Sequence, residues 1–164
     1  MKSLVVITVL VALNTLAFQE ACSQTSATQT VTLQVSSIQK LTVSGNPAPL
    51  IINAGTAGTE GLTSVSDATT SYSETHNSTA PLKITAGIDV VLGTGYTLQI
   101  ALASTKGTSS GTVDISNATT AVTVVTAIAK GSDNGKVITY TFSATAAAGV
   151  LLSTTKTVTL TITS

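Results

Sequence analysis

The feature that most constrains this chain is a two-residue alternation of threonine with aliphatic side chains. Residues 155–163 read TKTVTLTIT and residues 28–35 read TQTVTLQV, so that polar and aliphatic side chains take turns along both segments. Successive side chains of a β-strand point to opposite faces, and this pattern therefore predicts strands with one buried and one solvated face. Thr and Val are also branched at Cβ, which favours strands over helices.

Further short segments of this kind lie between turn residues. We predict strands at residues 38–43, 50–52, 82–86, 96–102, 113–115, 122–128, 137–144 and 155–163, with one or two more around Val65 and Tyr72. Residues 131–135 (GSDNG) contain an Asn-Gly dipeptide, which suits a tight hairpin. No amphipathic stretch is long enough for a βαβ unit. The sequence predicts an all-β fold, a single immunoglobulin-like Greek-key β-sandwich of about eight or nine short strands.

The first residues differ in character from the rest of the chain. Lys2 gives a short positive start, and residues 4–18 form an uncharged, mostly apolar run that ends before Gln19. The run is shorter than the roughly 20 residues of a membrane-spanning helix, which is typical of a secretory signal peptide. We predict a signal peptide over residues 1–23 and one domain over residues 24–164. An uncleaved anchor is the alternative interpretation.

Cys22 is the only cysteine of the chain, and it lies just before the predicted cleavage site after Ser23. Cleavage there leaves a domain without cysteine, so that core burial and sheet pairing must supply its stability. Ala21 also suits the position before a lipoprotein cysteine, which makes lipidation of Cys22 a second alternative. The predicted location is secreted, at the cell surface, with no membrane attachment unless Cys22 is lipidated.

Charged residues are few. Seven basic and seven acidic residues give a net charge of zero, and charged residues make up only 9% of the chain. Binding to nucleic acid depends on clustered Lys or Arg side chains that displace counterions from phosphates. The sequence therefore predicts no nucleic-acid partner.

The residues that carry catalytic chemistry in other proteins are scattered here. His76 is the only histidine, and its polar neighbours favour a solvated turn. The acids of the domain stand singly, and Asp133 begins a DNG triplet that predicts a plain hairpin rather than a calcium loop. No nucleophile with a nearby base is recognisable from the sequence. We predict no catalytic residue, no cofactor, no metal site and no enzymatic activity.

Aromatic side chains are also few, although sugar-binding sandwiches usually present them to sugar rings. The predicted domain has no Trp, and Tyr140 and Phe142 share one strand face, which favours the core. Sugar binding through polar loops, such as residues 54–61 and 106–111, is the alternative function.

The opening of the domain at residues 28–35, its ending at residues 155–164 (TKTVTLTITS) and the short export signal resemble bacterial secreted pilin-like and spore-coat-U-like β-sandwich proteins. The resemblance implies a subunit of a fibre or coat. It transfers no catalytic residue.

These observations predict a non-catalytic secreted structural subunit of a bacterial surface fibre, pilus-like filament or coat. Its partners are other copies of itself, joined by strand addition. Residues 24–35 are the candidate assembly strand, with Val31, Leu33 and Val35 as apolar anchors. The competing interpretation makes the same segment the first strand of its own sandwich. An extracellular adhesin or carbohydrate-binding module is the alternative function.

Overall fold

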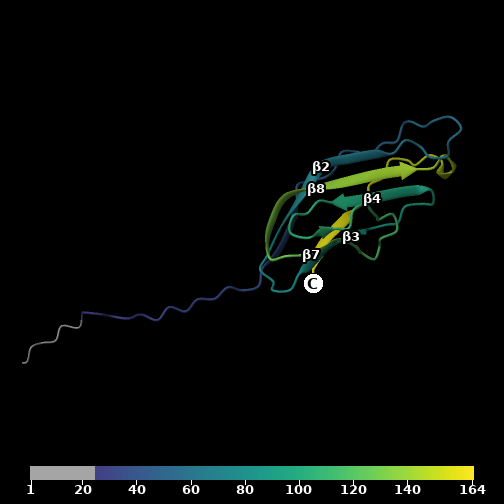
Figure 1. The fold of residues 1–164 in the computed structure, drawn as a ribbon. Helices are drawn as coiled ribbons and strands as arrows, with labels where there is room; N and C mark the ends of the chain where they lie inside the picture. The colour runs from purple at the N-terminus through teal and green to yellow at the C-terminus, as the bar shows by residue number, and fades with distance from the viewer. Residues whose placement is uncertain (1–24) are drawn as a thin grey trace, which may run out of the picture. The chain divides into compact units, whose positions relative to one another are not determined.

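The structure is a computed structural model that describes residues 25–164. Its fold is all-β, with 47% strand, and the strands form two antiparallel sheets in a sandwich-like layout (Figure 1). This confirms the predicted fold class at that level. The predicted signal peptide, its cleavage site and Cys22 lie outside the described residues.

The two sheets contain nine strands within residues 25–164. The five-stranded sheet has the order β1 (Gln39–Val43), β2 (Val65–His76), β8 (Gly131–Ala144), β4 (Tyr96–Leu102) and β6 (Val113–Asp114). The four-stranded sheet has the order β5 (Thr108–Ser109), β7 (Val122–Ile128), β3 (Leu82–Ile88) and β9 (Val158–Thr163). One 3-10 turn, η1 (Ala146–Ala148), follows β8. From β2 onward, every connection carries the chain from one sheet to the other.

Side-chain alternation places the core between the sheets. In β3 and β4 every second residue is buried, and Ile84 and Ile100 are fully enclosed. Tyr140 is buried, and Phe142 packs against the same cluster, as the sequence predicts for the pair. Burial of one large aliphatic side chain stabilises a fold by roughly 1.5–3 kcal/mol. The inward faces of both sheets thus join in one hydrophobic cluster.

Two strand predictions differ from the structure. Residues 28–35 and residues 50–52 have no strand, although both are rich in aliphatic residues. The alternation of polar and apolar residues predicts which face of a strand is apolar. A strand also needs a neighbouring strand that pairs with its backbone N–H and C=O groups. Of the one or two strands predicted around Val65 and Tyr72, the structure has one, of 12 residues.

The predicted hairpin at residues 131–135 is wrong, because this segment lies inside β8. Tyr72 pairs with Lys136 and Glu74 pairs with Asp133, so that Ser73 alone faces Asn134 and Gly135. This is a β-bulge, and Gly135 adopts the positive φ of +61° that such a bulge favours. The Ser73 hydroxyl accepts a hydrogen bond from the Gly135 N–H at 3.0 Å. The tolerance of Asn-Gly for positive φ serves a bulge here.

Gly95 provides a direct stability test of the sandwich. Its φ is +86°, and a Cβ at this position would lie 2.6 Å from Ala148 Cβ and 2.7 Å from Thr145 Oγ1. Gly58 has a similar φ of +82° with no atom within 4 Å. We expect Gly58→Ala to lower the free energy of unfolding by about 1 kcal/mol and Gly95→Ala by about 2–4 kcal/mol. Urea denaturation measures both, and equal losses would contradict the tight contact at Gly95.

Candidate functional site

The predicted assembly residues lie in the described part of the first of two units, Met1–Val35, while Ser36–Ser164 form the other. Val31, Leu33 and Val35 are 72%, 86% and 83% exposed, and residues 25–35 have no secondary structure. Isolated exposed aliphatic residues are ordinary on protein surfaces, but three at alternate positions share one face whenever the segment is a strand, and then form an apolar strip. The segment therefore has the sequence pattern of a strand but does not form one in the described structure.

The sandwich itself begins with a side-chain clamp. The Ile38 N–H donates to Asn77 Oδ1 at 2.7 Å, and the Asn77 N–H donates to the Ile38 carbonyl at 3.2 Å. Asn77 Nδ2 also donates to the Ser36 carbonyl at 2.8 Å. A two-residue hairpin over Ser36 and Ser37 would need the Ile38 N–H to bond Val35. Because Asn77 occupies that N–H, the clamp opposes a two-residue hairpin over Ser36 and Ser37.

The two longer edge strands have unpaired backbone N–H and C=O groups on one side. β1 pairs only with β2, and β9 pairs only with β3. The other two edge strands of the described sheets, β5 and β6, have two residues each. β1 and β9 contact each other, so both open edges lie on the same side of the sandwich.

The inward face of β9 is only half covered. Leu160 lies opposite the buried Ala86, and Ile162 lies opposite the buried Ile84. Directly opposite residues of an antiparallel pair share one face, so both side chains of β9 point to the core. They are nevertheless partly exposed, as is Leu41 on β1. The open side of the sandwich thus combines unpaired backbone groups with apolar side chains.

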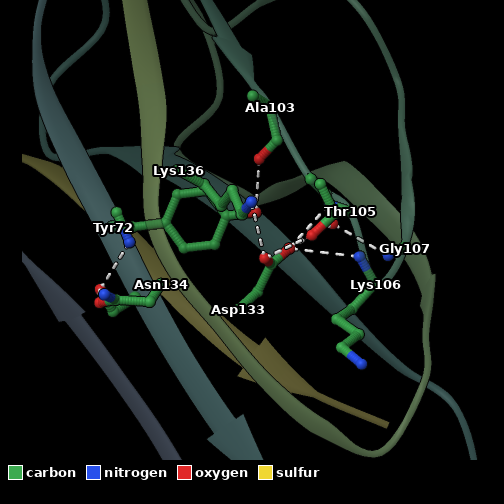
Figure 2. A network of polar contacts seen from close by, with 11 residues as sticks. Tyr72, Ala103, Thr105, Lys106, Gly107, Asp133, Asn134 and Lys136 are labelled. Carbon is green, nitrogen blue, oxygen red and sulfur yellow. Dashed lines mark hydrogen bonds and ion pairs between the residues drawn. The ribbon is translucent and has the colours of Figure 1, made fainter.

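A polar cluster joins the loop after β4 to the start of β8, with Asp133 at its centre (Figure 2). The Asp133 carboxylate accepts hydrogen bonds from Thr105 N and Thr105 Oγ1, both at 2.7 Å, and from Lys106 N at 3.2 Å. Lys136 Nζ lies 3.0 Å from Asp133 Oδ1. Burial acts to raise the pKa of Asp133, but these hydrogen bonds and the ion pair outweigh it and hold the pKa well below its usual range. Through these hydrogen bonds, Asp133 on β8 stabilises the loop that follows β4.

The prediction of His76 as a solvated turn residue is wrong. His76 ends β2 and is 2% exposed, and Glu74 on the same face is 3% exposed. Alternation along β2 points Tyr72, Glu74 and His76 inward, and only Asn77 begins the polar turn. The residues next to His76 in the sequence are polar, so the sequence does not show that this position faces the core.

Glu74 and His76 are unusual because they are buried without partners. Both carboxylate oxygens of Glu74 and both ring nitrogens of His76 lack a hydrogen bond within the described residues. Burial raises the pKa of the Glu74 carboxyl; His76 acts to lower it, and the nearby charge of Asp133 adds to the rise. Burial of an unsatisfied polar group costs about 1–3 kcal/mol. An ionised Glu74 carboxylate without a partner therefore destabilises the fold.

The acids stand singly in the sequence, but Glu74 and Asp133 lie directly opposite each other on β2 and β8. The bulge at Asn134 and Gly135 shifts the parity of β8, which brings Asp133 inside instead of Asn134. The Asn-Gly dipeptide is the available signal, because its tolerance of positive φ suits a bulge as well as a turn. In residues 25–164, no three His, Cys, Asp or Glu side chains are placed to hold a metal ion.

A shallow depression of about 300 Å³ lies away from the polar cluster. Residues 92–97 line it together with Asp114, Ser116 and Asn117. Asp114 Oδ1 accepts a hydrogen bond from Ser116 N at 2.8 Å. The Tyr96 ring stacks on Phe142 at a centroid distance of 6.4 Å, and its hydroxyl donates to the Ala148 carbonyl at 2.9 Å. The loops expected to bind sugars, residues 54–61 and 106–111, do not line this depression.

Comparison with known proteins adds no relative: no protein family, curated protein or solved structure matches this chain. In the part of the chain that the structure describes, no helix is long and apolar enough to cross a membrane.

The buried carboxyl of Glu74 leads to a pH-dependent prediction. Because its pKa is raised on folding, its contribution to stability is complete below the unfolded value near 4.5 and is lost as the pH rises through the folded value. We expect Glu74→Gln to leave the free energy of unfolding unchanged near pH 4 and to raise it at pH 8. Urea denaturation across this range measures the effect.

The matched control is Thr75→Ser, at an exposed position of the same strand that carries no titratable group. Its stability profile should run parallel to that of the unaltered protein between pH 4 and pH 8. A Glu74→Gln profile that is also parallel would show that Glu74 is not desolvated in the folded protein.

Proposed function

We propose that this protein is a non-catalytic, secreted structural subunit of a bacterial surface fibre, pilus-like filament or coat, and that it self-associates by adding β-strands between copies. The observation that carries the proposal is the exposed, alternating segment of residues 28–35, which precedes in sequence a domain with two open sheet edges. A strand of one copy supplies main-chain hydrogen bonds to an edge of another, and its alternate side chains supply specificity.

The energetic argument rests on Val31, Leu33 and Val35. Full burial of each side chain is worth roughly 1.5–3 kcal/mol, whereas leaving all three in water gains nothing. Ordering the segment costs conformational entropy, which the new backbone hydrogen bonds and the buried side chains must offset. The clamp of Ser36 and Ile38 by Asn77 favours pairing with another copy, because it opposes a tight hairpin within the chain.

Low charge supports close packing of many copies. The net charge is zero, and only 9% of the residues are charged, so that little electrostatic repulsion opposes association. The signal-like residues 1–23 and the resemblance to pilin-like and spore-coat-U-like proteins support a location outside the cell. Asp133, the best-satisfied acid of the polar cluster, is fully engaged in structural hydrogen bonds, and this favours a structural over a catalytic role.

We also propose how the strands of the sandwich are connected. The immunoglobulin-like order contains hairpins within one sheet, whereas only β1 and β2 are sequence neighbours in a sheet here. Alternation of successive strands between two sheets supports a Greek-key sandwich of the jelly-roll kind instead.

A sugar-binding or adhesive role is the second candidate. The depression beside Tyr96 favours it, because Asp114 and Asn117 supply polar groups next to an aromatic residue. Saturable binding of the secreted protein to a glycan on an array would support this role if the Asp114→Ala variant no longer binds.

The experiment for the structural role changes the three apolar anchors. We expect Val31→Ser, Leu33→Ser and Val35→Ser in one chain to abolish sedimenting polymers while the domain remains folded, because strand addition loses its buried side chains. Analytical ultracentrifugation and far-UV circular dichroism measure the two properties. The matched control replaces Thr28, Thr30 and Thr32 by Ser on the opposite face and should polymerise normally.

Deletion of residues 24–35 separates the two interpretations of the segment. A folded domain that no longer polymerises supports donation to another copy, whereas an unfolded domain shows an intrachain core strand. An unaltered protein that stays monomeric at high concentration, without fibres by electron microscopy, would overturn the proposed function.

A further inference from the structure

Strand β9 has an edge without the features that usually prevent sheets from joining. Val158–Thr163 contains no charge and no Pro, and its register with β3 runs without a bulge. Soluble proteins commonly protect an edge with Lys, Pro, a bulge or a very short strand. Lys40 lies on β1, and β5 and β6 are short. Among the edge strands of the described residues, β9 is therefore the least protected.

The hydrogen-bond pattern shows which backbone groups of β9 are free. The Thr157 carbonyl accepts from the Asp89 N–H of the β3 side at 3.0 Å. Backbone groups alternate in direction along an antiparallel strand, so Thr159 and Thr161 also face β3. The N–H and C=O groups of Val158, Leu160 and Ile162 consequently point to the open edge. The side chains of the same three residues lie on the half-covered inward face.

This edge is complementary to itself. In an antiparallel pair of two β9 strands centred on Leu160, Val158 of each copy faces Ile162 of the other, and Leu160 faces Leu160. All three residues then present free N–H and C=O groups to each other. Aliphatic side chains meet on the inward face, and Thr159 faces Thr161 on the outward face. No charged residue of β9 opposes the pairing.

We propose that two copies of this chain join through β9 in a symmetric antiparallel pair centred on Leu160, which makes one continuous eight-stranded sheet from two four-stranded sheets. The inference rests on the proposed self-association and specifies one of its contacts. Such a two-fold contact uses the same surface of both copies and closes after two subunits. A longer fibre then needs a second contact, which the segment of residues 28–35 supplies at another edge.

Disulfide trapping tests this register. Thr159 and Thr161 are the outward residues that face each other across the axis, at a position where Cα atoms of an antiparallel pair lie about 4.5 Å apart. This spacing permits a disulfide. We use the full chain with Cys22→Ser, so that the introduced thiol is the only one. Thr159→Cys and Thr161→Cys are prepared separately, and a mixture of the two is oxidised.

The expected result is a covalent dimer in the mixture and none with either variant alone. Thr42→Cys, an exposed outward residue of β1, mixed with Thr159→Cys controls for random collision and should give no dimer. Dimers of Thr159→Cys alone or Thr161→Cys alone would overturn the register, because each requires a shift of the pair by two residues.

Absence of any dimer in the mixture would overturn the β9 contact. If the same unoxidised sample still sediments as polymer, self-association stands and only the β9 contact fails. If it sediments as monomer at every concentration, the proposed function fails with it.

Discussion

Backbone hydrogen bonding between antiparallel strands is the constraint on which the rest of this structure depends. Inner strands such as β8 and β3 use their N–H and C=O groups on both sides, whereas β1 and β9 use them on one side only. Both open edges lie on the same side of the sandwich, and the side chains behind them are half covered. The exposed strip of Val31, Leu33 and Val35 has the alternation that such an edge accepts. Unpaired backbone and uncovered apolar surface therefore point to the same kind of partner, another strand.

The interior is not uniformly apolar, and its polar residues differ in their cost. Asp133 is buried with a full set of donors, so its charge stabilises the loop after β4 against β8. Glu74 lies directly opposite, without any donor, beside the equally unpartnered His76. The bulge at Gly135 produces this juxtaposition, because it turns Asp133 rather than Asn134 toward the core. Asp133 thus stabilises this part of the sandwich, whereas the unpartnered Glu74 and His76 cost stability.

Sequence reasoning reached the fold class because Thr and aliphatic residues alternate wherever a strand crosses the sheet. It placed β3, β4, β7 and β9 well, since their period is regular. It failed at residues 28–35, where the pattern of a strand has no partner, because periodicity contains no information about pairing. It also failed at His76, because β2 extends to that residue and turns its side chain inward. At Asn134–Gly135 it failed because a bulge changes which side chains of β8 face the core. The open edge of β9 needed the sheet order, which depends on contacts distant in sequence.

Residue-resolved hydrogen exchange at low and high protein concentration tests the central claim that open strand edges join copies of this chain. In dilute protein, the amides of Val158, Leu160 and Ile162 should exchange rapidly, whereas those of Thr159 and Thr161 should be protected by β3. At high concentration, the first three amides and the alternate amides of residues 28–35 should become protected as strands add. Unchanged exchange of these amides under conditions where the protein sediments as an assembly would contradict the account, because the copies would then associate through surfaces other than strand edges.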